Sequence, residues 1–248
     1  MKIEWFCLIN LNKIVKKHIF GVNPPIMFKY HRYPKAIILQ AVYFKLRFTL
    51  SYRDIEELLQ IRGVNVDHST IQRWVFKFSP VIEKNMHKRK RSVGNSWRMD
   101  ETYIKVGGKD RFLYRAIDKE GNTVDFLLTK RRQKVSAQKF FNKAIGNNGK
   151  PRVINIDKSG SNYSAIRVVN KRNCSVKTIK IRQRKYLNNI VKQDHRNIKR
   201  RISICTGFKD FESAQRTLSG IEVVNIIRKN QITDSKSTRF KTFKSLAS

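Results

Sequence analysis

The chain has 248 residues, of which 54 are Lys or Arg and 18 are Asp or Glu, giving a formal net charge of +36. Because 40% of the residues are hydrophobic, the chain can bury a substantial core, which excludes a wholly disordered basic protein. The positive charge is spread along the whole chain and indicates a polyanionic partner, most commonly nucleic acid. An A- and T-rich genome would also raise the Lys content, but the many arginines favour phosphate contacts.

Cysteine spacing and the lack of long apolar runs limit the class of protein further. Cys7, Cys174 and Cys205 are far apart and lack the spacing of a zinc site, so we expect free thiols in a reducing compartment. No run reaches the ~18 apolar residues of a membrane helix. Residues 1–26 lack a signal-peptide cleavage site and end at Asn23-Pro-Pro25. They form an N-terminal extension, for which a misplaced start is one interpretation and a translated segment the other. We therefore expect a cytoplasmic protein with no membrane partner.

Residues 27–80 predict a bundle of three helices. The first helix begins after Pro34, the second follows a capping-box variant at Ser51, and the third begins at Asp67 and ends at Pro80. This order is typical of a helix-turn-helix domain, whose last helix enters the major groove of DNA. The alternative is a plain helical bundle that supports the rest of the chain. On the third helix, the side chains expected to reach DNA are those of Thr70, Gln72, Arg73 and Lys77.

A basic linker and a mixed sheet follow the helices. Residues 81–95 contain the run His87-Lys-Arg-Lys-Arg91, and we expect them to form a linker that is solvated or follows a DNA backbone. The order of the elements after the linker predicts a mixed sheet covered by helices, and hence an α/β fold. Residues 232–248 are polar and basic and are expected to form a mobile tail. The predicted elements are strands at 97–106, 111–117 and 123–129, a helix at 134–145, a strand at 152–157, a helix at 162–169, a short strand at 177–180, and helices at 191–205 and 211–228.

Two aspartates stand in strand contexts that suit a metal site. Asp100 lies inside the apolar run 97–106, and Asp157 ends the run 152–157. Ligands collect at the carboxyl ends of strands in α/β sheets, so the pair is a natural site for a hard divalent cation. The alternative for each is a capping or turn carboxylate. Strand alternation places Glu101 on the face opposite Asp100, so we do not expect Glu101 to join the site.

A series of motifs occurs in an order that points to one family. The motifs are Gly63-Val-Asn-Val-Asp-His-Ser-Thr-Ile-x-Arg-Trp74, Met99-Asp-Glu-Thr-Tyr-Ile-Lys-Val106, Leu113-Tyr-Arg-Ala-Ile-Asp118, Tyr186-Leu-Asn-Asn-Ile190, Asp194-His195 with Lys199-Arg-Arg201, and Gly207-Phe-Lys209 with Gly220-Ile-Glu222. This ordered string resembles bacterial insertion-sequence transposases of the DDE superfamily, in particular insertion sequence family six. The resemblance covers roughly residues 27–231.

The resemblance implies a fold, a substrate and a cofactor. A helix-turn-helix would bind terminal inverted repeats, and an RNase H-like catalytic domain would occupy residues 96–231. Three carboxylates would bind two Mg²⁺ ions, which activate water or a DNA 3′-hydroxyl for attack on a phosphodiester. Two of these carboxylates fall on Asp100 and Asp157, as catalytic and metal-binding residues. The partner would be double-stranded DNA, both the inverted repeats and the target, bound by a homo-oligomer at the bacterial nucleoid.

The third acidic position of the family pattern is occupied by Lys192. An ammonium group cannot coordinate Mg²⁺ and repels a dication. Asp194 lies ~200° around the helix from position 192 and is not expected to replace the missing ligand. The first hypothesis is therefore a transposase with impaired DNA cleavage and strand transfer. The alternative is a catalytically dead DNA-binding remnant that competes with or regulates transposition, so whether the chain is an active enzyme stays open.

Two further expectations concern the basic helix at 191–205 and the class of protein. Its cluster Lys199, Arg200 and Arg201 is expected to hold DNA phosphates. A helix-turn-helix regulator with a sensor domain is disfavoured, because such a protein has no need for carboxylates at two strand positions.

Overall fold

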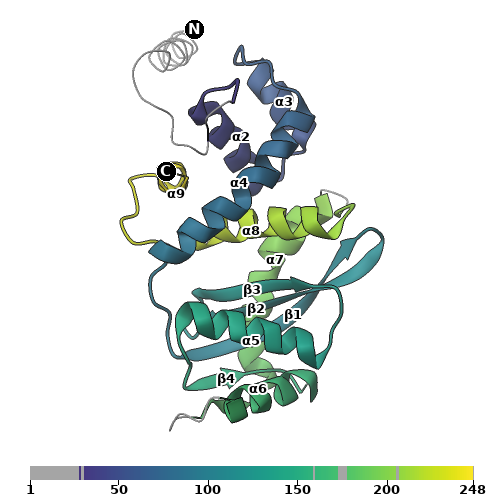
Figure 1. The fold of residues 1–248 in the computed structure, drawn as a ribbon, viewed down its shortest axis with the longest axis vertical. Helices are drawn as coiled ribbons and strands as arrows, with labels where there is room; N and C mark the ends of the chain where they lie inside the picture. Colours follow the sequence, from purple (N-terminus) through teal and green to yellow (C-terminus); the bar gives the residue numbers. More distant parts are fainter. Residues whose placement is uncertain (1–27, 29–30, 159, 173–177, 205–206, 248) are drawn as a thin grey trace.

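The computed structural model of the chain describes residues 28, 31–158, 160–172, 178–204 and 207–247. The extension expected at residues 1–26 lies outside the described residues. A layer of helices stands at one end of a five-stranded sheet, and further helices cover both faces of that sheet (Figure 1). No helix of the described part of the chain is long and apolar enough to cross a membrane.

The helical layer begins with the three helices predicted from the sequence, α2 (Lys35–Arg47), α3 (Tyr52–Gln60) and α4 (His68–Arg89). The capping box at the start of α3 is confirmed, because the Ser51 hydroxyl accepts from the Asp54 backbone at 3.0 Å and the Asp54 carboxylate accepts from the Ser51 backbone at 2.7 Å. These bonds satisfy two of the four backbone N–H groups that a helix start leaves free.

The prediction that the third helix ends at Pro80 is wrong, because α4 continues through Pro80 to Arg89. A proline inside a helix costs about 3 kcal/mol. Ile82 and Met86 follow it and are fully buried in the core cluster shared with α8 (Phe211–Arg228). Burial of two such side chains contributes roughly 3–6 kcal/mol, which offsets the cost of the proline. The segment 81–95, expected as a linker, is therefore helical over residues 81–89.

The predicted sheet is confirmed, with the strand order β3-β2-β1-β4-β5. The first three strands are antiparallel, whereas β4 and β5 run parallel to β1, so the sheet is mixed and the fold class is α/β. β4 pairs with only the first three residues of β1, Ser96 to Arg98. The strands are β1 (Ser96–Val106), β2 (Lys109–Asp118), β3 (Thr123–Thr129), β4 (Val153–Asn155) and β5 (Lys180–Arg182).

Helices cover the two faces of the sheet and divide its core. α5 (Lys134–Asn148) and α6 (Gly160–Arg172) lie in front of the sheet in Figure 1, and α7 (Asn189–Ile204), which follows the short 3-10 helix η2 (Lys185–Asn188), lies behind it. One cluster of buried side chains packs under α5 and α6 and includes Met99 and Phe140. The other joins the opposite face of the sheet to α8 and the helical layer, so the layer and the sheet share one core.

The prediction of a mobile tail over residues 232–248 is also wrong. Ile232 is buried and bridges to Lys90, and α9 (Arg239–Leu246) follows. Phe243 and Leu246 are buried, three residues apart, on one stripe of this short helix. The Phe243 ring centroid lies 5.2 Å from that of Tyr43 on α2. The tail is polar overall, so its sequence composition does not reveal this apolar stripe. The short helix α9 is stable because α2, α4 and α8 provide an apolar surface on which it packs.

Candidate active site

Three carboxylates meet beside the free edge of β1. Asp100, Glu101 and Asp157 each bring one oxygen to within 4.8 Å of the others. The expectation that Glu101 stays away from Asp100 is therefore wrong, although the two side chains leave opposite faces of the strand. β4 pairs with β1 only as far as Arg98, so Asp100 and Glu101 can both turn around the unpaired edge toward Asp157, which follows β4.

A buried amide and an arginine hold two of these carboxylates. The Nδ2 atom of Asn162, on α6, donates to Glu101 Oε1 at 3.1 Å and to Asp157 Oδ1 at 3.4 Å. Asn162 is fully buried, and its Oδ1 atom has no hydrogen-bond partner in the described part of the chain. Arg132, in the segment between β3 and α5, pairs with Glu101 at 3.2 Å and with Asp157 at 3.3 Å. Asn162 is thus a neutral donor to the cluster, and Arg132 is a partly exposed counterion.

The electrostatics of the cluster favour a bound cation. Burial, together with the charges of Glu101 and Asp157, raises the pKa of Asp100 to about 6, although Lys192 acts in the opposite direction. Burial also raises the pKa of Glu101, against the opposing effects of Arg132 and Asn162. Carboxylates that share a site in this way repel one another, and a divalent cation between them would remove the repulsion. Asp157 is the most open of the three, with 38% of its side chain exposed.

The α7 side of the site carries a buried histidine. His195 Nε2 lies 4.0 Å from Asp100 Oδ2, and neither ring nitrogen has a hydrogen-bond partner in the described residues. Burial, helped by the nearby Arg115, lowers the pKa of His195 to about 3, so the imidazole is neutral. Lys192 is exposed one turn earlier on α7 and lowers the pKa of both Asp100 and His195. The position at which the family pattern has a Glu therefore lies beside this cluster.

Asp194 is engaged elsewhere. Its Oδ2 atom accepts from Arg115 Nη2 at 2.7 Å, and its Oδ1 atom lies 3.0 Å from Lys229 Nζ. Against the effect of burial, these two cations lower the pKa of Asp194 below its ordinary value. Arg115 is fully buried and also pairs with the buried Glu222 of α8. This network ties α7 and α8 to β2 and leaves neither oxygen of Asp194 for a metal ion.

The residues expected to contact DNA fall into two groups. On α4, the side chains of Gln72, Arg73 and Lys77 are exposed and that of Thr70 is half-buried. Arg73 donates to Ser69 Oγ at 3.4 Å, within the same helix.

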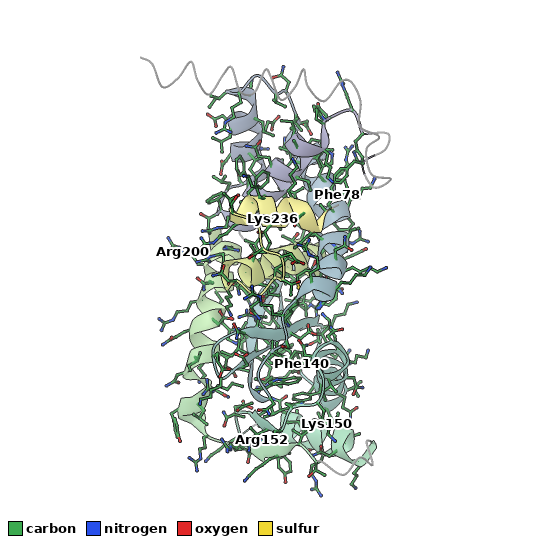
Figure 2. The ribbon with its side chains drawn as sticks, turned by 90° about the vertical axis from the view of Figure 1, so that its left-hand side faces the viewer. Phe78, Phe140, Lys150, Arg152, Arg200 and Lys236 are labelled. Carbon is green, nitrogen blue, oxygen red and sulfur yellow. The ribbon has the colours of Figure 1, made fainter. Side chains whose placement is uncertain are left out.

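On α7, the side chains of Lys199 and Arg200 are exposed, and Arg200 points outward from the helix in Figure 2. Arg201 requires a correction, because it is 8% exposed and its Nη1 atom donates to the carbonyl of Leu46 at 2.9 Å. The geometry thus makes Arg201 a link between α7 and the last turn of α2, not a side chain open to phosphate.

The sequence patterns do not mark Glu101, Asn162, Arg132 or His195 as members of the site. A weak signal existed for Glu101 and Asn162, since each lies close in sequence to a predicted aspartate. None existed for Arg132, which belongs to a basic run, Lys130 to Arg132, whose members look alike in sequence.

Comparisons with known proteins show which family the chain resembles. A family profile described as a DDE domain matches residues 94–231. The transposase for insertion sequence-like element IS431mec of Staphylococcus aureus strain Mu50 is 42% identical over 207 residues, which cover 82% of this chain and 88% of that protein. The transposase for insertion sequence element IS257 in transposon Tn4003 of Staphylococcus aureus is 41% identical over the same length and coverage.

Solved structures also resemble the chain, at low sequence identity. The trimeric form of the HTLV-2 integrase catalytic core domain in complex with magnesium is 17% identical and covers 62% of this chain and 99% of that chain, with a TM-score of 0.43. The expected α/β fold with a mixed sheet is confirmed by the strand order and strand directions of the structure.

Proposed function

Because this chain belongs to the DDE-domain family of insertion-sequence transposases, we propose that it binds the terminal inverted repeats of a DNA element and cleaves and transfers DNA strands with a divalent metal ion. Its activity is limited by Lys192, and it works as a homo-oligomer on DNA at the bacterial nucleoid. The single observation that carries the proposal is the cluster of Asp100, Glu101 and Asp157 beside the free edge of β1.

The residues of the cluster fit a hard cation such as Mg²⁺. Three carboxylates converge from two chain segments, and the carbonyl oxygen of a buried amide, Asn162, lacks a partner in the described residues. A bound ion would supply Lewis-acid polarisation of a phosphodiester and activation of the attacking oxygen. Asp100 and Asp157 would bind and orient the ion, and the neutral His195 adds no positive charge of its own to the α7 side of the site.

Glu101 supplies the third carboxylate in place of the residue at position 192. The carboxyl of Glu101 already lies in the cluster, whereas the Lys192 ammonium lies on the α7 side, where it opposes a second dication. Arg132 is the residue that must give way when an ion enters, because it pairs with both Glu101 and Asp157. On this basis the site binds one ion well and a second ion poorly, so its activity is reduced but not abolished.

The DNA contacts are proposed for two helices. α4 carries Gln72, Arg73 and Lys77 on its exposed side, with Thr70 at the rim, and would enter the major groove of the repeat. α7 carries Lys199 and Arg200, which would hold backbone phosphates. Arg201 is not proposed as a DNA contact, because it is buried and bonded to the carbonyl of Leu46.

The alternative function is that of a DNA-binding remnant without catalytic activity. The presence of Lys192 beside Asp100 favours it, because two dications are needed to clamp both oxygens in a two-metal transfer. Such a protein would occupy inverted repeats or form mixed oligomers with intact copies and so reduce transposition.

A strand-transfer assay on an oligonucleotide that carries the terminal repeat, with Mg²⁺ or Mn²⁺, separates these possibilities. We expect native protein to transfer strands faster than Asp100→Ala, and Glu101→Gln to fall to the background rate of Asp100→Ala. We expect the rate of Lys192→Glu to exceed the native rate by about tenfold or more, which corresponds to about 1.4 kcal/mol in the activation barrier. Native protein equal to Asp100→Ala, with an active Lys192→Glu variant, would establish the remnant instead. Full activity of Glu101→Gln would remove Glu101 from the metal site. Mn²⁺ binding followed by electron paramagnetic resonance gives a second readout for each variant.

A further inference from the structure

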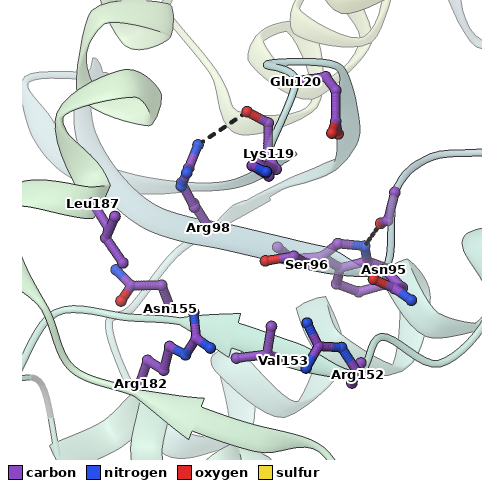
Figure 3. Close-up of a pocket in the computed structure, with 12 residues that line it drawn as sticks. Asn95, Ser96, Arg98, Lys119, Glu120, Arg152, Val153, Asn155, Arg182 and Leu187 are labelled. Carbon is purple, nitrogen blue, oxygen red and sulfur yellow. Dashed lines mark hydrogen bonds between the residues drawn. The ribbon is translucent and has the colours of Figure 1, made fainter.

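A second concave site lies at the start of β1, away from the acidic cluster. It is a hollow of about 490 Å³ between the first residues of β1, the turn after β2, and strands β4 and β5. Figure 3 shows Arg98, Arg152 and Arg182 around this hollow, with Lys119 and Glu120 on the turn above it. These residues come from four separate segments of the chain, and none of them is among the DNA contacts expected from the sequence.

Strand register sets the positions of two of the arginines. Arg98 pairs with Asn155 between β1 and β4, and Asn155 pairs with Arg182 between β4 and β5. Residues in register on neighbouring strands point to the same face of the sheet, and the strands are ~4.8 Å apart, so the Cα atoms of Arg98 and Arg182 lie roughly 10 Å apart. Two guanidinium groups therefore flank one row of the sheet, on the face that also carries Asp100.

The surroundings of the hollow are fixed by hydrogen bonds. Arg98 Nη1 donates to the carbonyl of Lys119 at 3.2 Å, and the buried Asp118 holds the adjoining turn by accepting from the backbone of Asn122 at 2.8 Å. The Asn155 side chain donates to the Arg184 carbonyl and to Asn188 Oδ1, at 3.1 and 2.6 Å. Asn155, at the centre of the floor, is therefore held by internal bonds, whereas the guanidinium groups of Arg152 and Arg182 have no hydrogen bond to another of the described residues and can bind a ligand.

The charge of the hollow is unbalanced. Its lining contains the four cations Arg98, Lys119, Arg152 and Arg182 but one carboxylate, that of Glu120. A concave surface lined by one sign of charge concentrates the field and draws in ions of the opposite sign. Guanidinium groups match the oxygens of phosphate in shape and number of donors, so a phosphate is the anion that this lining would recognise best.

We propose that this hollow binds the phosphodiester backbone of the DNA strand that passes the active site. The inference rests on the proposed function for the identity of the polyanion. Arg98 and Asp100 lie two residues apart on one strand face, ~7 Å along β1, which is within one or two nucleotides of the reacting phosphate. A second copy of this chain is a poor occupant, because each copy carries a formal charge of +36.

The first test measures DNA affinity by fluorescence anisotropy in EDTA at several salt concentrations, so that no strand chemistry occurs. The double variant Arg98→Ala/Arg182→Ala is compared with Lys139→Ala/Arg167→Ala, which removes two exposed charges from α5 and α6 on the other face of the sheet. We expect the first variant to lose at least about tenfold in affinity at low salt and to flatten the log–log salt slope by ~2, with the control close to native. Equal losses in the two double variants would overturn the proposal.

The second test maps the phosphates that matter in native protein and then repeats the map with the double variant. Single phosphates near the transferred end are replaced one at a time by neutral methylphosphonates. We expect one or two positions to weaken binding in native protein, and the same positions to have no effect in Arg98→Ala/Arg182→Ala. If no position matters, or if the variant stays equally sensitive, the hollow does not hold DNA.

Titration with inorganic phosphate distinguishes the sources of the anion. Tight binding of phosphate at Arg98 and Arg182, with DNA affinity unchanged in the double variant, would make the hollow a small-anion site and overturn the DNA assignment. Because binding in EDTA needs no catalysis, this result is independent of the strand-transfer assay that tests the proposed function.

Discussion

Asp100 stands at a position where the requirements of folding and of metal binding oppose each other. Burial raises its pKa from 3.8 to about 6. The folded protein therefore binds this proton more tightly than the unfolded chain does, so ionisation of Asp100 reduces stability. The penalty is absent below about pH 4, grows as the pH rises through the interval between the two pKa values, and is fully present above about pH 6.

Asp100→Asn should consequently raise the stability of the metal-free protein at pH 7.5. The expected gain is about 1–3 kcal/mol, since a pKa shift of one unit is worth ~1.4 kcal/mol. Thermal melts in EDTA at pH 7.5 and pH 4 measure it, with Asp110→Asn on the exposed hairpin as the control. The gain should disappear at pH 4, and added Mg²⁺ should stabilise native protein more than the variant. A lower melting temperature for Asp100→Asn at pH 7.5 would contradict this account.

The packing of α8 against α2 and α4 depends on a single glycine. A Cβ atom added to Gly220 would lie 2.6 Å from a methyl of Leu46 and 2.7 Å from Ser79 Oγ. No ordinary non-bonded contact is this short, so α8 could not keep its place with a larger residue at position 220. This close approach brings α8, and with it the Glu222 carboxylate that pairs with Arg115, against the helical layer and the sheet at once.

Gly220→Ala should therefore destabilise the protein by about 1–3 kcal/mol, the usual cost of overpacking. Gly146→Ala is the matched control, because Gly146 lies in α5 with no atom near its added Cβ and should gain about 0.5–1 kcal/mol from helix propensity. Chemical denaturation of both variants gives the free energies of unfolding. If the two substitutions shifted stability in the same direction, the contact at Gly220 would not have the importance assigned to it.

The positive charge of the whole molecule is divided between side chains that face solvent and side chains that hold the fold together. Lys199 and Arg200 are exposed on α7, whereas the neighbouring Arg201 is buried against α2. Burial, with the nearby charges of Arg228 and Arg47, lowers the pKa of Arg201 to about 10. Net charge alone therefore overstates the number of groups that can contact DNA.

Lys199→Ala/Arg200→Ala should weaken binding to inverted-repeat and scrambled duplexes alike and flatten the salt dependence by ~2 in log–log slope. Arg201→Ala should leave that slope close to native and lower the melting temperature instead, because it removes a buried hydrogen bond to Leu46. Affinities measured from low to high salt, together with thermal melts, test both statements. A slope change for Arg201→Ala as large as that of the double variant would show that Arg201 reaches phosphate after all.

Much of this protein follows from residues that are close together in the chain. Alternating and helical patterns predict the strands and most helices, since each reports which side of one element is apolar. The capping box at Ser51 and Asp54 is a local bond and was found from its two residues alone. Asp100 and Asp157 stand out for the same reason, because a carboxylate in an apolar strand is unusual wherever that strand packs.

The remaining features depend on contacts between distant segments, which no local pattern specifies. α4 passes Pro80 and α9 forms at the C-terminal end because each finds an apolar surface on α8 or α2. Glu101 joins the acidic cluster because β4 is too short to pair with β1 beyond Arg98. The same pairing aligns Arg98 with Arg182 through Asn155. Strand length, register and neighbouring surfaces are properties of the assembled sheet, so the tertiary structure alone could place these side chains.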